Sequence, residues 1–411
     1  MMRISPQRLL FSLALAVSLI GTGAVFPAQA EVDSFDARGA DQPVHLVLGL
    51  TPGLDEARAR ALIAERGAEL ERWLPELGLA RIAVPAGSIE AVAQGLAAQP
   101  DIEFVTEDRR SVEVAETPLD EHWSQQWGPA IVGLPAARDI AWGDPTVTIA
   151  VVDTGVSYWH LDLRDQIWIN PGESEVDPAT GKRTCNFGIA INGADDDGNG
   201  YDDDCRGYNF DSGTSDPQDV FGHGTAVAGV ASAATNNPDP YIASGYEGIA
   251  GMGGATQLMA LRAMDSSGRG TPFSIAEAIY YAADKGAQVV NLSVTLGVNP
   301  VPSDAEILCR ATSYAQARGA LVVGASGNHS NAETVSAVSY PAACPGVLAV
   351  GASTPADVRA SFSNGGERLD LVAPGQSIFS TLRTGTQSYG PWNGSGLGTS
   401  FAAPHAAGAA A

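Results

Sequence analysis

The chain has 411 residues, which is enough for two or three domains. Its 23 Lys and Arg residues are outnumbered by 47 Asp and Glu residues, so the formal net charge is −24. A surface of that sign repels nucleic acid and anionic lipid, and we expect neither as a partner.

The N-terminal segment has the organisation of a secretory signal peptide. Arg3 and Arg8 precede an apolar run from Leu9 to Ile20, and Ala28-Gln29-Ala30 is a small-x-small cleavage site. The run is short for a bilayer span, and no later segment is apolar for long enough to cross a membrane. We therefore expect residues 1–30 to be removed and the soluble product to be secreted, outside the cell or into the periplasm.

Residues 44–115 have a compact α+β pattern. Apolar "VHLVLGL" is followed by an amphipathic stretch, strand-like "LARIAVP", helical "SIEAVAQGLAAQ" and a last strand, "IEFVTED". Two β-α-β units in so short a segment are typical of a small ferredoxin-like sandwich of the split β-α-β kind. The polar "EVAETPLDEHWSQQWG" that follows is interpreted as a linker.

From about residue 125 short apolar strands alternate with helices. Continuous Val, Ile and Leu runs such as "TVTIAVVD", "LMALRAM" and "QVVNLSV" indicate strands buried on both faces. Between them, "TPFSIAEAIYYAADKG" and "SDAEILCRATSYAQARG" are helical stretches that end at glycine. The alternation predicts a three-layer, doubly wound, mostly parallel α/β sheet, in which chemistry collects beyond the carboxyl ends of the strands.

Four polar residues stand at such positions. Asp153 closes "TIAVVD", His223 lies in "GHGTAVAG", Asn328 ends "GASGN", and Ser400 opens the last helix, which we expect Thr399 to cap. Acyl transfer needs a hydroxyl nucleophile, an imidazole base, a carboxylate that orients the base, and donors for the oxyanion. One residue of each type is available, although the serine segment alone is equally consistent with an alanine-rich core helix.

In this order, "VVDTGV", "GHGTAVAG", "NLSV", "ASGN", "SFSNGGERLDLVAPG" and "GTSFAAPHAAG" resemble the signature blocks of subtilisin-like serine peptidases. The resemblance covers residues 125–411 and implies a subtilisin-like fold. It implies Asp153, His223 and Ser400 as the catalytic triad. It also implies that Asn328 and the Ser400 N–H stabilise the oxyanion, so that protein or peptide substrates are hydrolysed through an acyl-enzyme.

The N-terminal unit is similar to the propeptide of such enzymes. The resemblance implies that residues 31–118 inhibit the catalytic domain at 119–411 and assist its folding. A parallel sheet built from distant segments forms slowly, so a folding template is physically reasonable. We expect self-cleavage between about Val114 and Glu121, and a monomeric enzyme.

Two stretches resemble the substrate-flanking strands of the family, which pair with an extended peptide. They contain Ser293 in one strand and Gly268, Arg269 and Gly270 in the other. Thr295 stands where the family often has glycine, so its side chain would narrow the groove. Arg269 would favour an acidic substrate residue, or it is simply solvated.

The stretch "DDDGNGYDDD" follows the one, three, five, seven, nine spacing of a calcium loop, with Gly200 in sixth place. The expected Ca²⁺ ligands are Asp195, Asp197, Asn199, the Tyr201 carbonyl and Asp203. Arg206 replaces the glutamate of position twelve, so the site is not a standard one, and a solvated acidic loop without an ion is the alternative. Asp162 resembles a further calcium ligand of the family.

Four cysteines fit an exported protein with two disulfides. Cys185 and Cys205 bracket the acidic loop, and Cys309 and Cys344 remain. Three pairings are possible. We favour this local one, because a bridge between the first two residues would fasten the ends of the loop.

Two other functions compete with the peptidase. An inactive, peptide-binding protein of the same fold would lack a member of the triad, and none is missing. An esterase of the α/β-hydrolase fold would have Gly-x-Ser-x-Gly around its nucleophile, whereas the segment around Ser400 is Gly398-Thr399-Ser400-Phe401-Ala402. Since family members continue the last helix beyond Ala411, we also expect a catalytic domain truncated at its C-terminus, and an inactive fragment is a further alternative.

Overall fold

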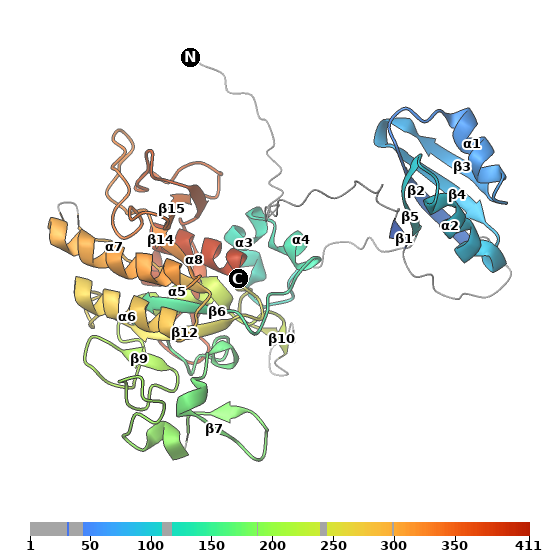
Figure 1. The fold of residues 1–411 in the computed structure, drawn as a ribbon. Coiled ribbons are helices and arrows are strands. Elements are labelled where there is room, and N and C mark those ends of the chain that lie inside the picture. Colours follow the sequence, from blue (N-terminus) through green and yellow to red (C-terminus); the bar gives the residue numbers. More distant parts are fainter. Residues whose placement is uncertain (1–30, 33–43, 109–116, 187, 239–244, 298–299) are drawn as a thin grey trace, which may run out of the picture. The chain divides into compact units, whose positions relative to one another are not determined.

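The computed structural model describes residues 31–32, 44–108, 117–186, 188–238, 245–297 and 300–411. The chain divides into two compact units, Met1–Glu113 and Val114–Ala411 (Figure 1). The expected signal peptide and the first three residues of the expected cleavage segment, 114–116, lie outside the described residues. No helix in the described ranges is long and apolar enough to cross a membrane.

The first unit is a sheet of strand order β1-β5-β2-β4-β3 with two helices. Strand β2 is antiparallel to β4 and to β5, while the short β1 pairs with β5 in parallel. Alternate residues of β2, among them Leu46 and Leu48, are buried against Ile63 of α1 and Leu96 of α2. The elements are β1 (Glu31–Val32), β2 (Val44–Leu50), α1 (Glu56–Ala64), β3 (Glu69–Leu74), η1 (Pro75–Leu77), β4 (Leu79–Val84), η2 (Ala86–Ser88), α2 (Ile89–Ala97) and β5 (Ile102–Glu107).

The second unit is built on a seven-stranded sheet of order β16-β15-β14-β13-β6-β12-β9. All neighbouring strands of this sheet pair in parallel. The predicted doubly wound parallel sheet is thereby confirmed. Its strands are β6 (Thr148–Asp153), β9 (Gly207–Asn209), β12 (Gln257–Arg262), β13 (Val289–Leu292), β14 (Leu321–Ala325), β15 (Leu348–Ser353) and β16 (Leu371–Pro374).

Helices cover both faces of this sheet. Ile149 and Val151 of β6 pack with α5 (His223–Ser232) and α8 (Thr399–Ala410). Ala150 and Val152 point the other way, to α6 (Pro272–Asp284) and α7 (Pro302–Ala317), which lie side by side in Figure 1. The two-residue period of a strand thus explains why each apolar run had to be continuous.

Shorter elements surround this core. Both favoured disulfides, Cys185–Cys205 and Cys309–Cys344, are present, which confirms that pairing. The remaining elements are η3 (Trp123–Gln125), α3 (Trp127–Ile131), α4 (Leu134–Arg138), η4 (Arg164–Gln166), η5 (Pro171–Glu173), β7 (Glu175–Val176), β8 (Arg183–Thr184), η6 (Gly188–Ile191), β10 (Asn237–Pro238), β11 (Tyr246–Glu247), β17 (Phe379–Thr381), β18 (Tyr389–Pro391) and η7 (Trp392–Gly394).

Candidate active site

The fold brings together Asp153 and His223. Asp153 is the last residue of β6 and is fully buried, and His223 is the first residue of α5. The Nδ1 atom of His223 lies 2.8 and 2.9 Å from the two carboxylate oxygens of Asp153. A Cβ added at Gly224 would lie 2.1 Å from the carbonyl oxygen of Gly155. Glycine after the histidine is therefore what lets α5 approach the end of β6 so closely.

The surroundings of His223 control its protonation. Burial disfavours the imidazolium, but the charge and hydrogen bond of Asp153, together with the charge of Asp219, outweigh it and raise the pKa of His223. Because Nδ1 is held by Asp153, Nε2 is the nitrogen that can exchange a proton with another group. The arrangement is that of a base oriented by a carboxylate.

The start of α8 carries Ser400 beside Asn328, but the local geometry corrects one expectation. Thr399 does not cap the helix: Gly398 is the N-cap, with φ of 151°, and Thr399 is the first helical residue. The Thr399 N–H and hydroxyl both donate to Oδ1 of Asn328, at 2.8 and 3.0 Å. The hydroxyl is therefore committed to the loop after β14, which fixes the orientation of the Asn328 amide.

Two N–H donors border one small space at Gly398. A Cβ added there would lie 3.6 Å from Asn328 Nδ2 and 3.6 Å from the backbone nitrogen of Ser400. Asn328 is exposed, and its Nδ2 has no hydrogen-bond partner in the described parts of the chain. Two N–H groups this close to one point beside a serine are the donors that an oxyanion site needs.

Ser293 has a contact that sequence reasoning missed. Its hydroxyl donates to the carbonyl oxygen of Ser400 at 2.7 Å and accepts from Asn291 Nδ2 at 2.9 Å. That carbonyl lacks its usual helical partner because Pro404, four residues on, has no N–H. The proline in "GTSFAAPHAAG" is the sequence feature that could have predicted an unpaired carbonyl at Ser400. Ser293 thus holds the helix of Ser400, and a role in binding peptide stays a prediction.

The other expected substrate segment is a turn. Asp265 N donates to the Arg269 carbonyl at 2.8 Å, and Gly268 has φ of 72°. Gly270 follows the turn, and its backbone lies against Ala263, since a Cβ added there would be 2.4 Å from the Ala263 carbonyl oxygen. Pairing of this stretch with a peptide remains a prediction.

Aromatic side chains surround the imidazole. The rings of Trp392 and Phe401 have centroids 5.0 and 5.7 Å from that of His223. Trp392 also meets Phe221 edge to face at 5.7 Å. These rings shield one side of His223 from water, which strengthens its interaction with Asp153. Trp392 begins the short η7, and no periodic pattern in the sequence marks it as part of the site.

The five calcium ligands expected from the spacing of the acidic loop stay a prediction. The Asp195 carboxylate accepts three backbone N–H groups of residues 198–200. The Asp203 carboxylate accepts those of residues 192–193. These loop N–H groups lack partners in regular structure, so neighbouring carboxylates take them. The described carboxylates that do converge, with ligand atoms within 4.8 Å of one another, are Glu173, Asp197 and Asp204.

Asp162 lies apart from that cluster, in the turns after β6. It is buried, and one of its oxygens accepts from Ile249 N at 3.0 Å. Asp120, also buried, accepts from Asn236 N at 2.9 Å. Asp120 Oδ2 and Asn237 Oδ1 are buried without a hydrogen-bond partner among the described residues. Both carboxylates thus accept backbone N–H groups from residues that follow α5.

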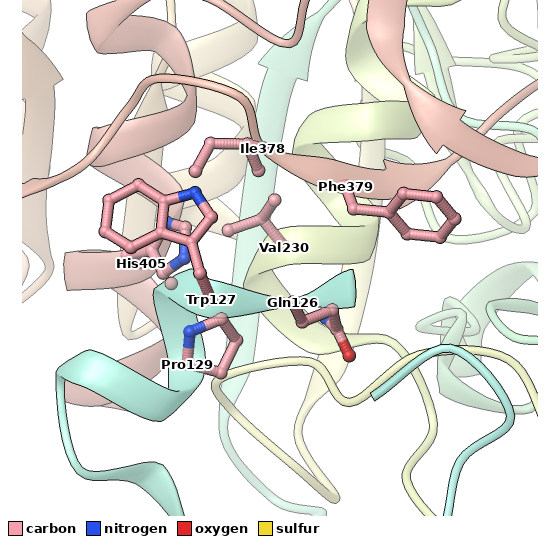
Figure 2. Close-up of a pocket in the computed structure, with 8 residues that line it drawn as sticks. Gln126, Trp127, Pro129, Val230, Ile378, Phe379 and His405 are labelled. Carbon is pink, nitrogen blue, oxygen red and sulfur yellow. The ribbon is translucent and has the colours of Figure 1, made fainter. Parts of the chain in front are cut away.

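His405 lies on the helix of Ser400 but away from Asp153. It is 2% exposed, and its Nδ1 lies 2.7 Å from the Phe401 carbonyl oxygen. Figure 2 shows it at a small pocket with Trp127, Val230 and Ile378. Its imidazole is thus occupied by packing against this pocket and by the Phe401 carbonyl.

Comparison with known proteins places the chain among serine proteinases. A sequence model described as the subtilase family matches residues 144–411. A thermophilic serine proteinase of Bacillus sp. (strain AK1) is 37% identical over 326 residues, covering 79% of this chain and 66% of that protein. Thermitase of Thermoactinomyces vulgaris is 35% identical over 297 residues, with 72% and 84% covered. An extracellular protease of Xanthomonas campestris pv. campestris is 35% identical over 356 residues, with 82% and 56% covered.

Proposed function

Because the chain belongs to the subtilase family of serine peptidases, we propose that it is a secreted endopeptidase, made as a zymogen, with Asp153, His223 and Ser400 as its triad. The observation that carries the proposal is the pair of 2.8 and 2.9 Å contacts from His223 to Asp153. Beside the serine, the nitrogens of two N–H donors lie 3.6 Å from one point, and acyl transfer requires such donors for its oxyanion.

The residues divide the chemistry as follows. His223 Nε2 takes the proton of Ser400 Oγ as the oxygen attacks the peptide carbonyl. Asp153 keeps the Nδ1–H tautomer in place and stabilises the imidazolium that forms. Asn328 Nδ2 and the Ser400 N–H stabilise the negative oxygen of the tetrahedral intermediate. His223 then protonates the leaving amine, and water hydrolyses the acyl-enzyme by the same steps.

The zymogen proposal assigns residues 31–118 to an inhibitory propeptide. Its support in the second unit is the attachment of the segment after residue 118. Leu119 N donates to Asn236 Oδ1 at 2.7 Å, and His122 N donates to the Gly248 carbonyl at 3.0 Å. A cut after Leu119 would break into this attachment, so we place self-cleavage in the first part of the expected interval, before Leu119.

Secretion is proposed from the leader at 1–30, the two disulfides and the acidic surface. The relative from Xanthomonas campestris is named an extracellular protease. We also propose that the enzyme is a monomer and that its substrates are proteins.

We also propose a structural calcium ion at Asp162, with Asp120 and Asn237. The support is a set of oxygen atoms of which Asp120 Oδ2 and Asn237 Oδ1 are buried without a partner among the described residues. Carboxylate and amide oxygens are the ligands that Ca²⁺ prefers, and this ion would cross-link the segment at Asp120 to the turn at Asp162.

The test expresses the chain from Glu31 with calcium, beside a Ser400→Ala variant, and follows mass and casein cleavage over time. We expect only the parent to lose its N-terminal unit and to digest casein. If both proteins fold and bind casein peptides but neither cleaves, an inactive peptide-binding protein is the better description. Cleavage by the Ser400→Ala variant at the parent's rate would refute the assignment of the nucleophile.

A further inference from the structure

Asn364 is a buried asparagine that holds the backbone on both sides of Asn328. It lies in "SFSNGG", between β15 and β16, and is 1% exposed. Its Oδ1 atom accepts from the backbone nitrogen of His329 at 2.8 Å and from Ser330 Oγ at 3.2 Å. Its own backbone N–H donates to the Gly327 carbonyl at 2.9 Å. The residues before and after Asn328 are therefore both attached to this one residue.

The other half of the Asn364 amide is also fully used. Nδ2 donates to the Ala337 carbonyl at 3.0 Å and to Ser339 Oγ at 3.2 Å. An amide turned over would direct its N–H groups at the His329 N–H and its oxygen at the Ala337 carbonyl, so only one orientation is compatible with these partners. The side chain therefore connects the loop after β14 to residues 337–339 in a fixed orientation.

The backbone of this loop packs tightly against the amide. Gly327 has φ of 108°, and a Cβ added there would lie 2.4 Å from Asn364 Nδ2. The loop is also attached to α8, because Gly327 N donates to the Thr399 hydroxyl at 3.1 Å and Asn328 Oδ1 accepts from Thr399 N. Asn328 itself is exposed, so its position is set by these attachments and not by its own burial.

We propose that Asn364 is a positioning residue for the oxyanion site, an inference that rests on the proposed role of Asn328. Oxyanion donors stabilise the transition state only when they are held in place before the negative charge forms. Asn364 is buried and its amide is fully engaged, so it acts through the position of Asn328 Nδ2 and not by contact with the substrate. Displacement of a catalytic group by about 1 Å can cost about 10²-fold in rate.

Removal of this amide should lower kcat and leave KM nearly unchanged. In Asn364→Ala the His329 N–H and the Ala337 carbonyl lose their partner, so the loop relaxes and Asn328 Nδ2 is displaced. We expect kcat to fall by about tenfold or more, but by no more than the roughly 10²–10³-fold expected for Asn328→Ala, because the weakened interaction forms only in the transition state. In the double variant, kcat should fall no further than in Asn328→Ala, since the amide through which Asn364 acts is gone.

Asn209 offers a matched control. It is 2% exposed, and its amide closes a turn with the same kinds of bonds. Its Oδ1 accepts from two backbone N–H groups of residues 211–212, while Nδ2 donates to Ser212 Oγ at 2.7 Å and to Thr214 Oγ1 at 3.3 Å. These partners follow β9, at the edge of the sheet, and none of them belongs to the loop after β14. Asn209→Ala should therefore lower the melting temperature but keep the parent's kcat.

The experiment measures kcat, KM and melting temperature for the parent, the two single variants, the double variant and Asn209→Ala, each expressed from Glu31. The substrate is a peptide p-nitroanilide, and active sites are counted with a serine-reactive inhibitor so that kcat refers to competent enzyme. The expected result is a loss of kcat in Asn364→Ala at unchanged KM, with no loss in Asn209→Ala and no additional loss in the double variant. If Asn364→Ala does not fold, Asn364→Asp replaces it. That variant keeps an acceptor for the His329 N–H but cannot donate to the Ala337 carbonyl, so the same loss is expected.

Three outcomes would overturn the inference while the peptidase assignment stands. They are an unchanged kcat in a folded Asn364 variant, a double variant in which the two losses multiply, and an equal loss of kcat in Asn209→Ala, which would show that kcat follows stability. Failure of the proposed function looks different. The parent would not cleave the substrate, or Asn328→Ala would keep the parent's kcat, and the inference would be overturned with it.

Discussion

Acid should destabilise the catalytic unit through His405. Since a carbonyl can only accept, Nδ1 of His405 is the protonated nitrogen and donates to Phe401 O at 2.7 Å. The other nitrogen, Nε2, is buried without a hydrogen-bond partner among the described residues, next to Gly128 and the apolar side chains of Figure 2. A proton added at Nε2 would place a charged N–H against Trp127 and Val230 with no acceptor.

The size of this effect follows from the shift in protonation. Burial outweighs the Phe401 carbonyl and lowers the pKa of His405 from 6.5 to about 4. Between these pH values the unfolded chain binds more protons than the folded one, so stability rises with pH in this window and is lost as pH falls below 6.5. The difference corresponds to about 3 kcal/mol of unfolding free energy near pH 4.

The assay is urea unfolding of the second unit at pH 7 and pH 4.5, in the Ser400→Ala background. His405→Gln keeps an N–H that can reach Phe401 O but does not titrate, so its loss between the two pH values should be smaller than the parent's by about 2–3 kcal/mol. His329→Gln, at an exposed histidine, is the matched control and should behave as the parent. An equal loss in His405→Gln and the parent would refute the reasoning.

Three further predictions concern the catalytic unit. Asn328→Ala should lower kcat by about 10²–10³-fold, and its melting temperature should fall because the Thr399 N–H loses its acceptor. Asn328→Asp should also lose activity, but it keeps that acceptor and should melt at the parent's temperature. If both variants melted equally far below the parent, this reasoning would be wrong. Asp153→Asn should lower kcat by about 10⁴-fold and move the acid limb of kcat/KM to lower pH, because the Asp153 charge raises the pKa of His223 against the effect of burial; an unmoved limb in a pH–rate profile would count against the pair. Replacing both cysteines of Cys185–Cys205 by serine should cost about 3 kcal/mol in denaturant unfolding, as expected for a bridge between residues 20 apart, and an unchanged midpoint would show that the loop is held without it.

The sequence could predict those features that depend on local pattern. The apolar run of β6 must be continuous because both faces of the sheet are covered, and Asp153 then marks its carboxyl end. His223 could be placed because the glycine after it signals close approach of α5 to the sheet. Such reasoning finds the elements of the fold and the side chains at strand ends, since each is encoded within a few residues.

The features that the sequence did not predict depend on contacts between distant segments. The loop spacing predicts a calcium site within residues 195–203, and in the structure the carboxylates of Asp195 and Asp203 accept backbone N–H groups of the loop. The three carboxylates that converge are Asp197, which the spacing predicts, and Glu173 and Asp204, which it does not, and the ammonium group of Lys285 at the end of α6 lies beside them. No one-dimensional spacing connects residues 173, 204 and 285, because the register of the tertiary fold brings them together.

The helix of Ser400 shows why one motif combines several constraints. Pro404 leaves the Ser400 carbonyl without a helical donor, and Ser293 Oγ donates to that carbonyl. The first turn of α8 is therefore bound to the residue that follows β13. A Cβ at Gly128 would lie 2.6 Å from His405 Nε2, so the segment of α3 can approach this helix only through glycine. The same helix therefore carries the proposed nucleophile, accepts the Ser293 hydroxyl in place of a missing backbone donor and buries a neutral histidine. A Pro404→Ala substitution would restore a backbone N–H that competes with the Ser293 hydroxyl for the Ser400 carbonyl oxygen. We expect it to shift the position of Ser400, and so to lower kcat, while leaving the melting temperature nearly unchanged.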